Sequence, residues 1–292
     1  MDLRHVRAFL AVAETLHFAR AAEGLGIAPP SLTVQIRDLE SDLGTTLFYR
    51  TKRVVRLSPA GEAFLPEAQA VLAQVERAES VGRRAGRGEI GRIEIGYVGS
   101  ATYSGALQNH VAAFRRAQPA VEIVCTEHKM DALPDLLVEG QVDLAFVRLP
   151  MHLPAGLRAR TVVRDRFRLA VATTSRWGDG WRGKSVDPAE LAQELFVLPE
   201  QVAGTLEVGR RGGFTPRLGP HPGSLISVAT YVALGTGVAV VPSALPDSVH
   251  LPGVVFRELA GKPIVSEIAV LHRHREQHPV VANLIKQIVP AA

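Results

Sequence analysis

The sequence contains a single cysteine, Cys125, among 292 residues. One thiol cannot form a disulfide within the chain or supply a cysteine-based zinc site, so an oxidant sensor that closes an internal disulfide is excluded. Residues 1–5 carry scattered charges and lack the pattern of a secretory signal peptide. No segment approaches the roughly 18 consecutive apolar residues of a membrane span. We therefore expect a cytoplasmic protein that does not enter a membrane.

The composition is that of a folded chain, with 47% hydrophobic and 21% charged residues. At this length we expect two domains or one large domain. The formal net charge is +4. This charge permits a nucleic-acid partner but is equally compatible with an ordinary arginine-rich protein.

Three short helices are predicted at the start of the chain. Apolar residues at helical spacing indicate a helix over residues 3–13 and a second over residues 18–25. Pro29 and Pro30 fit only the first turn of a third helix, which Gly44 ends. The residues of this helix expected to face the core are Leu32, Ile36, Leu39 and Leu43. Short helices joined by tight turns predict a helix-turn-helix.

The opposite face of the third helix is the candidate DNA-reading surface. In a major groove, the outward Val34 could contact a thymine methyl group, and the alternative is a tolerated exposed side chain. Arg37 and Thr33 could contact bases or phosphates. The DNA-binding residues predicted on this helix are Pro30, Ser31, Thr33, Val34 and Arg37.

A short basic hairpin is predicted over residues 47–57. It contains Arg50, Lys52, Arg53 and Arg56. A basic cluster next to a helix-turn-helix suits phosphates or the minor groove, although a run of charges more often forms a solvated surface. We expect DNA contacts from Arg50, Lys52 and Arg53.

A long helix is predicted from Pro59 to about residue 84, with Ser58 as its N-cap. Its apolar residues form a narrow stripe, made of Phe64, Leu65, Ala68, Val71, Leu72, Val75 and Ala78. Such a stripe usually packs on an identical partner, and the alternative is packing on its own domain. Residues 83–89 are polar and glycine-rich, which predicts a linker.

Strands and helices alternate beyond the linker, which predicts α/β architecture with largely parallel sheets. The expected strands cover residues 92–98, 121–127, 142–148, 167–172, 196–198, 238–241, 254–259 and 266–272. A helix is expected over residues 103–116. The remaining length is enough for two small subdomains with a cleft between them.

The motifs of residues 2–62 resemble the DNA-binding head of LysR-type transcriptional regulators. They include Ala21-Ala22-Glu23, Pro30-Ser31-Leu32, Leu43-Gly44 and Leu57-Ser58-Pro59-Ala60-Gly61. The rest of the chain is similar to the effector domain of that family. Its landmarks include Gly91-Arg92-Ile93-Glu94-Ile95-Gly96 and Val142-Asp143-Leu144-Ala145-Phe146.

This resemblance implies an α/β fold class. An N-terminal all-α winged helix-turn-helix would precede a C-terminal effector domain of two subdomains, similar in fold to type II periplasmic binding proteins. The implied parts are a DNA-binding domain over 1–58, a dimerisation helix and hinge over 59–90, and an effector-binding domain over 91–292. Subdomain I would cover residues 91–165 and 267–292, and subdomain II residues 166–266.

The resemblance also implies partners. A homodimer or homotetramer would bind an imperfect inverted repeat of double-stranded DNA, because two-fold symmetry requires equivalent half-sites. RNA polymerase is left open as a further partner. Two positions depart from the family pattern. Pro29 stands where the family commonly has a glutamine, and Val34 stands where it often has a basic or polar residue. The operator sequence therefore cannot be transferred from other members.

A small-molecule site is predicted where the strand over 92–98 ends and a helix begins. Backbone N–H groups and the helix dipole favour an anion there, and Ser100 and Thr102 add hydroxyl donors. We expect a carboxylate-bearing effector at Ser100, and the alternative is that both hydroxyls only cap the helix.

Further parts of this site follow from the rule that ligands of parallel sheets bind at the carboxyl ends of strands. The rule adds residues 128–130, Arg148 and residues 200–204, with the start of a helix at Leu225 across the cleft. The predicted effector-binding residues are Ser100, Ala101, Thr102, His128, Met130, Arg148, Val202, Leu225 and Ile226.

The nature of the effector is suggested by the run Phe146-Val147-Arg148-Leu149-Pro150. This run resembles the branch of the family that regulates aromatic-compound breakdown and responds to muconate or benzoate. That branch typically has a hydroxyl where Met130 stands, so an aromatic or otherwise bulky carboxylate fits better than muconate.

The hypothesis is a sequence-specific DNA-binding transcriptional regulator controlled by a small molecule. The alternatives are a small-molecule-binding protein with no transcriptional role, and an α/β enzyme fused to a DNA-binding domain. Ser, His and Asp residues show no catalytic spacing, and the glycines at 235–237 follow a helix, the wrong order for a dinucleotide loop. His272, His274 and His278 alternate with arginines, which favours a solvated surface over a metal site. We expect no enzymatic activity, no cofactor and no metal.

Overall fold

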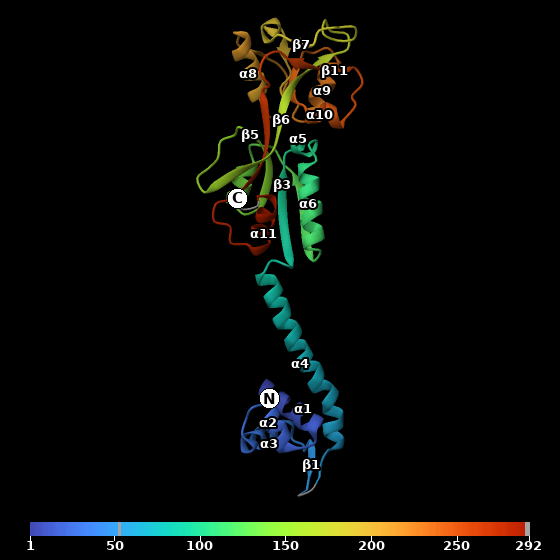
Figure 1. Cartoon of the computed structure of the whole chain (residues 1–292), viewed down its shortest axis with the longest axis vertical. Helices are drawn as coiled ribbons and strands as arrows, with labels where there is room; N and C mark the ends of the chain where they lie inside the picture. Colours follow the sequence, from blue (N-terminus) through green and yellow to red (C-terminus); the bar gives the residue numbers. More distant parts are fainter. Residues whose placement is uncertain (52–53, 290–292) are drawn as a thin grey trace. The chain divides into compact units, whose positions relative to one another are not determined.

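A computed structural model describes residues 1–51 and 54–289, and it divides into two compact units, Met1–Arg84 and Ala85–Ala292 (Figure 1). Lys52 and Arg53, two of the predicted DNA contacts, lie outside the described residues. No described helix combines the length and apolar character needed to cross a membrane. Each unit is described by itself below.

The first unit, here called the head, begins with the predicted helices. They are α1 (Leu3–Thr15), α2 (Phe18–Gly24) and α3 (Pro29–Leu43). The Asp2 carboxylate accepts a hydrogen bond from the Arg4 N–H at 2.8 Å and so caps α1. Gly44 ends α3 with a φ of 65°, a left-handed conformation that glycine adopts without strain.

The core of the head forms where α3 packs on the first two helices. Leu32, Ile36 and Leu39 are fully buried, as predicted, together with Phe9. The prediction for Leu43 is wrong, because its side chain is 39% exposed. It belongs to the last turn of α3, where residues 41–44 are all exposed, so no other element covers it.

The predicted hairpin consists of β1 (Phe48–Arg50) and β2 (Val55–Leu57), paired antiparallel. Phe48 anchors it to the helices, since its ring centroid lies 5.2 Å from that of Phe9. Ser58 is the predicted N-cap, and its Oγ accepts a hydrogen bond from the Gly61 N–H at 3.0 Å.

The long helix α4 (Pro59–Gly86) extends past the predicted end, so the connection to the second unit is shorter than the predicted linker. Near its start the stripe packs on the head core, with Ala68 fully buried and Leu72 partly buried. Val71 is 37% exposed, Val75 is partly buried and Ala78 is exposed, and Val81 beyond the stripe is 48% exposed. The first half of the stripe thus packs on its own domain, and the second half is left open.

The second unit is built on one mixed sheet with the strand order β4-β3-β5-β12-β6-β11-β7, to which β10 adds by pairing with β6. Its elements are β3 (Gly91–Tyr97), α5 (Gly99–Thr102), α6 (Ala106–Ala117), β4 (Val121–Glu127), α7 (Leu133–Val138), β5 (Leu144–Leu149), β6 (Leu157–Ala172), β7 (Ser185–Val186), the 3-10 helix η1 (Pro188–Leu191), β8 (Leu195–Phe196), α8 (Ala203–Gly212), β9 (Arg217–Leu218), α9 (Leu225–Ala233), β10 (Ala239–Pro242), α10 (Ala244–Ser248), β11 (Val254–Leu259), β12 (Val265–Arg273) and α11 (Pro279–Ile288).

The expectation of largely parallel sheets is wrong. Only β3, β4 and β5 form a parallel block of three strands. The long strands β6 and β12 pair antiparallel with each other, and β12 is also antiparallel to β5. These two strands run from one half of the unit to the other, so the chain enters the second half along β6 and returns along β12 (Figure 1).

Separate hydrophobic cores mark the two halves of this unit. One core contains residues of β3, β5, α6 and α11, and we call this part the α6 half. Two further clusters gather around the end of β6, β10, α8 and α9, and we call this part the α9 half. Separate cores support the predicted division into two subdomains, whose boundaries stay a prediction.

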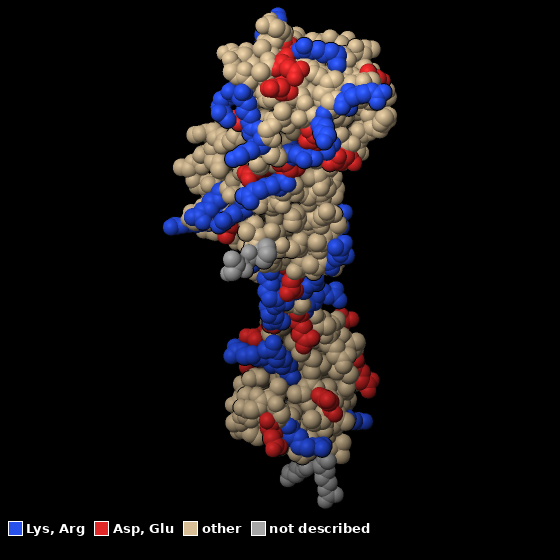
Figure 2. All heavy atoms as spheres, turned by 45° about the horizontal axis from the view of Figure 1, so that its top comes forward, with Lys and Arg blue, Asp and Glu red and all other residues tan. Residues whose placement is uncertain are grey.

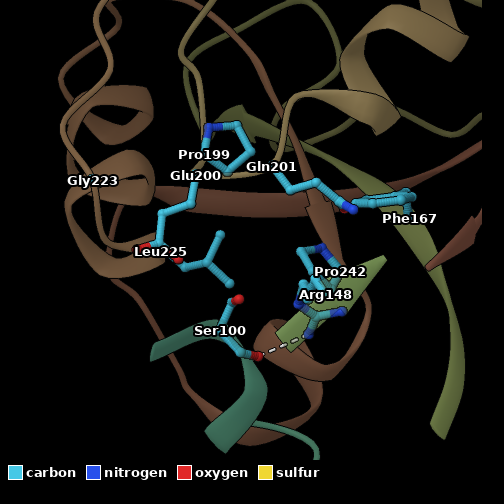
Figure 3. Close-up of a pocket in the computed structure, with 9 residues that line it drawn as sticks. All are labelled: Ser100, Arg148, Phe167, Pro199, Glu200, Gln201, Gly223, Leu225 and Pro242. Atoms are coloured by element: carbon cyan, nitrogen blue, oxygen red, sulfur yellow. Dashed lines mark hydrogen bonds between the residues drawn. The ribbon is translucent and has the colours of Figure 1, made fainter. Parts of the chain in front are cut away.

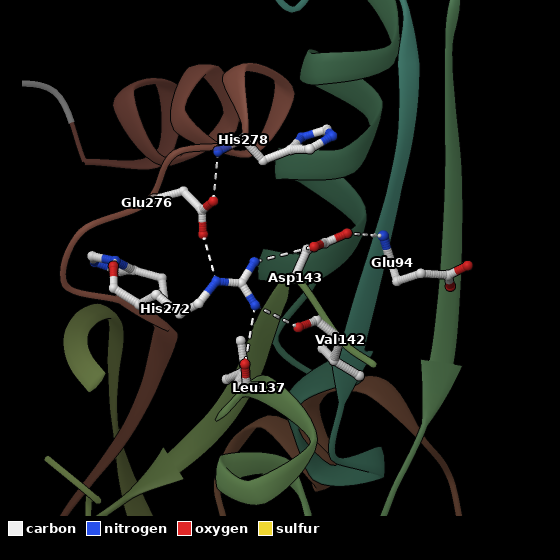
Figure 4. A network of polar contacts seen from close by, with 8 residues as sticks. Glu94, Leu137, Val142, Asp143, His272, Glu276 and His278 are labelled. Carbon is white, nitrogen blue, oxygen red and sulfur yellow. Dashed lines mark hydrogen bonds and ion pairs between the residues drawn. The ribbon is translucent and has the colours of Figure 1, made fainter. Parts of the chain in front are cut away.

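A polar network holds the base of the α6 half together (Figure 4). The Arg273 guanidinium donates to the Leu137 carbonyl at 3.0 Å, the Asp143 carboxylate at 3.2 Å and the Glu276 carboxylate at 2.9 Å. Asp143 in turn accepts the Glu94 N–H at 2.9 Å. Because its donors and acceptors are paired, this network stabilises the fold and offers no free group to a ligand.

Candidate functional site

The outward face of α3 has the orientation that the sequence predicts. Pro30, Ser31 and Arg37 are exposed, and Val34 is 49% exposed. Thr33 is partly buried, and its Oγ1 donates to the Pro29 carbonyl at 3.0 Å. The contact of these side chains with DNA stays a prediction.

Arg50 is exposed, but its guanidinium pairs with residues of the head itself. Its Nη2 lies 2.7 Å from the Glu40 carboxylate, and its guanidinium carbon lies 4.7 Å from the Phe18 ring centroid. Glu40 also accepts the backbone N–H of Leu47 at 2.8 Å and thereby fastens the hairpin to α3. These contacts favour a structural role for Arg50, and the sequence signal for it was an acidic residue ten positions earlier on the helix.

Lysine and arginine side chains are spread over the visible face of both units and are interspersed with acidic ones (Figure 2). The net charge of +4 therefore does not by itself mark one surface as the nucleic-acid interface. The argument for DNA contact depends on the geometry of α3 instead.

The second candidate site is a cavity of about 250 Å³ between the two halves of the second unit. We call it the Ser100 pocket (Figure 3). Its lining consists of Ser100, Arg148, Phe167, Pro199, Glu200, Gln201, Gly223, Leu225 and Pro242. Ser100 and Arg148 belong to the α6 half, and the other residues face them from the end of β6 and from the α9 half.

Arg148 lies at the end of β5 and is only 2% exposed. Its Nη1 donates to the Ser266 Oγ at 2.6 Å and its Nη2 to the Ser100 carbonyl at 2.8 Å. The Asp165 carboxylate lies 3.7 Å from Nη1. Burial lowers the pKa of Arg148, and the charges of Asp165 and Glu200 oppose that shift. Among the described residues, the buried Nε has no hydrogen-bond partner.

Two polar residues face Arg148 from the α9 half. Gln201 is 6% exposed, its Nε2 donates to the Pro150 carbonyl at 3.4 Å, and its Oε1 has no partner within the described chain. Glu200 is partly buried. Burial raises the pKa of Glu200, the carboxylates of Glu127 and Asp131 raise it further, and Arg148 lowers it.

A second cavity, of about 690 Å³, adjoins the first. We call it the Lys129 pocket, and its lining consists of Lys129, Met130, Asp131, Glu200, His221 and Gly223. Glu200 and Gly223 line both pockets. The two together offer room for a ligand that extends beyond Ser100.

The structure brings together some of the predicted effector residues. Ser100, Arg148 and Leu225 line the Ser100 pocket, and Met130 lines the Lys129 pocket. The predicted residues that line neither of these two pockets are Ala101, Thr102, His128, Val202 and Ile226.

The position of four of these five has a physical reason. Ala101 is fully buried in the core of the α6 half, and Val202 packs on a core of the α9 half. The Thr102 hydroxyl donates to the Gly99 carbonyl at 2.7 Å. Ile226 is on an exposed face of α9. We have no physical account of the position of His128.

The predicted helix behind Ser100 also needs correction. The expected helix over 103–116 begins only at Ala106, and α5 before it is four residues long. Gly105 separates the two with a left-handed φ of 73°. So short a helix has little dipole, and the anion argument now depends on the side chains of Ser100 and Arg148.

Four lining residues were missed, namely Phe167, Pro199, Gly223 and Pro242. Pro242 ends β10, which pairs antiparallel with β6, so the carboxyl-end rule for parallel strands does not cover it. Phe167 was expected at the start of a strand but lies inside the long β6. For the histidines at 272, 274 and 278, the described part of the chain contains no group of His, Cys, Asp and Glu suited to a metal ion.

Comparison with known families gives two matches. Residues 3–62 match the bacterial regulatory helix-turn-helix protein, lysR family, and residues 86–292 match the LysR substrate binding domain. The chain is 34% identical to the HTH-type transcriptional regulator IlvR of Caulobacter vibrioides, over 99% of this chain and 97% of the relative. It is 30% identical to the regulator AlsR of Bacillus subtilis, over 98% and 94%.

Solved structures agree with these matches. The crystal structure of full-length CbnR complexed with its target DNA covers 99% of this chain and 98% of its own, with a TM-score of 0.79 and 26% identity. The crystal structure of full-length BenM covers 99% and 95%, with a TM-score of 0.57 and 28% identity. Both the helix-turn-helix head and the two-part second unit thus have solved counterparts.

Proposed function

Because the chain belongs to the LysR family of transcriptional regulators, we propose that the Ser100 pocket is the site where its controlling small molecule binds. The protein is a DNA-binding transcriptional regulator controlled by a small molecule. The observation that carries the assignment is the buried Arg148, which lines a cavity between two halves of one unit and whose Nε has no partner among the described residues. A buried donor without an acceptor is costly, so a ligand oxygen there is favourable.

The proposed mechanism follows from where the pocket lies. A ligand in it contacts Ser100 and Arg148 on the α6 half, and Gln201 and Leu225 on the α9 half. It therefore favours the arrangement of the halves in which both sets are within reach. The ligand shifts the regulator between states only as far as it binds one arrangement better than the other.

The proposed ligand carries a carboxylate. The Ser100 hydroxyl and Arg148 Nε supply hydrogen-bond donors, and Phe167, Leu225 and Pro242 supply apolar walls. Ligand pockets of this composition fix one polar group and bury the remainder of the ligand against apolar side chains. Because the Ser100 pocket itself is narrow, the apolar part of a small aromatic or branched aliphatic acid would extend into the adjoining Lys129 pocket.

The head would act through α3, with Arg37 and Val34 directed at the major groove. The exposed side chains of Val71, Ala78 and Val81 along α4 support pairing with a second copy. We propose a homodimer or homotetramer on an imperfect inverted repeat, with RNA polymerase as a further partner and the cytoplasm as the location of a DNA-bound regulator. We also propose that the chain has no catalytic role, since its family consists of regulators.

The test is a thermal-shift screen of the full chain with aromatic and dicarboxylic acids, followed by calorimetry of those that raise Tm. Ser100→Ala should weaken binding of each such acid while leaving DNA binding without ligand unchanged. Thr102→Ala is the matched control, because its hydroxyl is bonded to the Gly99 carbonyl and should not affect affinity. Equal affinity of wild type and Ser100→Ala would remove Ser100 from the site.

A further inference from the structure

We propose that the effector carries a protonated amine as well as a carboxylate, and that Glu200 and Gln201 bind the amine. This inference rests on the proposed function of the Ser100 pocket. It makes the ligand a zwitterion, such as an amino acid, in place of a simple organic acid.

The charges around the two pockets point to a cation. Three acidic side chains act on this region, namely Glu127, Asp131 and Glu200. Two bases line the pockets, Arg148 and Lys129. The first of these is already opposed by the buried Asp165 carboxylate at 3.7 Å. The region therefore holds an excess of negative charge, which disfavours a ligand that is only an anion.

Glu200 is the acidic residue best placed to bind a ligand cation, because it lines both pockets. The charges of Glu127 on β4, Asp131 before α7 and Arg148 on β5 act on it electrostatically. Its carboxylate is disfavoured by burial and by these like charges. A ligand ammonium group would relieve both effects, since it supplies an opposite charge and hydrogen-bond donors.

Gln201 gives a second and independent observation. The contact of its Nε2 with the Pro150 carbonyl assigns the amide orientation, because a carbonyl can only accept. The Oε1 atom is then a buried acceptor that no described group satisfies. Figure 3 shows Glu200 and Gln201 across the pocket from Ser100, with the Glu200 side chain directed toward Leu225 and the Gln201 side chain toward Phe167. An ammonium N–H would satisfy Oε1, whereas a carboxylate oxygen could not.

The two ends of the pocket therefore favour different ligand groups, a hydrogen-bond acceptor at one end and a hydrogen-bond donor at the other. Among the described residues, Arg148 Nε lacks an acceptor and Gln201 Oε1 lacks a donor. Ser100 lines the pocket beside the first, and Glu200 lines it on the wall of the second. A zwitterion supplies both. A dicarboxylate would bring its second charge toward Glu200, Glu127 and Asp131, which costs affinity.

The experiment is calorimetry of the full chain with pairs of probes that differ in one group. In each pair a methyl group or hydrogen replaces the ammonium group: 4-(aminomethyl)benzoate with 4-ethylbenzoate, phenylalanine with 3-phenylpropionate, and 4-aminobutyrate with pentanoate. We expect at least one amine-bearing member to bind about tenfold or more tightly than its partner, the scale of one charged hydrogen bond. Glu200→Gln should reduce that preference about tenfold.

The control is Glu267→Gln. Glu267 is also partly buried, and its carboxylate lies 2.7 Å from Arg164, outside both pockets. This variant should keep the full preference. Equal or tighter binding of the amine-free acids by wild type would overturn the inference and leave the proposed function intact. If neither kind of probe bound at about 10 mM, tenfold above a Kd of 1 mM, both proposals would fail.

Discussion

The recognition face of α3 and the Ser100 pocket differ in how far their polar side chains are exposed to solvent. On α3, Arg37 is exposed and Val34 is half exposed, and neither is needed to hold the head together. In the pocket, Arg148 and Gln201 are 2% and 6% exposed, and each has an unpaired polar atom. A side chain that contacts DNA has to lie on the surface, because DNA is too large to be enclosed by the protein. A side chain that binds a metabolite can be buried together with that ligand.

This contrast has a consequence for function. Changes on α3 should alter DNA binding with little effect on folding, because the side chains there have few internal contacts. Changes in the pocket should alter stability and ligand binding together, because the same buried groups serve both.

The largest effect is expected for Arg148→Met. Loss of the guanidinium leaves the buried Asp165 carboxylate without its cation, and it removes donors from the Ser266 hydroxyl and the Ser100 carbonyl. We expect the second unit to lose about 3–5 kcal/mol, the usual cost of breaking a buried ion pair. Urea unfolding followed by tryptophan fluorescence measures this unit alone, since both tryptophans of the chain belong to it.

Arg164→Met is the control for that prediction. Its side chain is 73% exposed, and its pairing with Glu267 is a surface salt bridge. Such pairs contribute at most about 1 kcal/mol. Equal losses in the two variants would show that the pocket does not depend on its buried charge.

The next effect concerns binding. Arg37→Ala should lower the preference for DNA from the chain's own promoter region over random duplex by about 1–3 kcal/mol, the scale of one specific base contact. The Tm should be unchanged, because Arg37 is exposed. Fluorescence anisotropy at fixed salt measures both affinities, and Arg7→Ala on the exposed surface of α1 is the control. If the Arg37 variant kept the full preference for promoter DNA over random duplex, Arg37 would not be a base-contacting residue.

The sequence predicted the head far better than the pocket. Helical spacing buries Leu32, Ile36 and Leu39, and capping by Ser58 and Gly44 sets where elements start and stop. These signals act over a few residues and can be read locally. The error at Leu43 came from the end of α3, where helical phase alone does not say whether another element covers the last turn.

The pocket is assembled from segments far apart in the chain. Ser100 and Pro242 line one cavity, and the intervening path depends on the antiparallel crossing of β6 and β12. An alternating pattern predicts strands but not their direction, so Phe167 was not expected at this site. The unpaired atoms of Arg148 and Gln201 are visible only once their neighbours in space are known.

A smaller effect on stability is expected for Arg50, a head residue that makes contacts within its own domain. Arg50→Ala removes the ion pair with Glu40 and the stacking on Phe18. We expect the head to lose about 1–2 kcal/mol while sequence preference is retained. Calorimetric melting of the full chain would resolve the head transition, with Arg7→Ala as the exposed control. If the Arg50 variant lost its preference for promoter DNA but kept the stability of the head, Arg50 would be a DNA-contacting residue, as first predicted.

The smallest effect, and one of opposite sign, is expected for Glu200→Gln in the absence of ligand. Burial, followed by the charges of Glu127 and Asp131, raises the pKa of Glu200 in the folded protein. The folded state therefore holds this proton more tightly than the unfolded state. The resulting stability is complete below the unfolded pKa of about 4.3 and is lost as pH rises through the raised folded value.

Glutamine does not titrate, so the variant avoids that loss. At pH 7 it should be more stable than wild type by less than about 1 kcal/mol, as expected for a partly exposed charge, and the difference should vanish toward pH 4. Melting curves across this range measure it, and Glu267→Gln, which loses a salt bridge, should show no gain. A variant that is more stable yet binds amines less well would show that the pocket retains an unfavourable charge because the ligand needs it. A variant less stable than wild type at pH 7 would instead make Glu200 a structural residue.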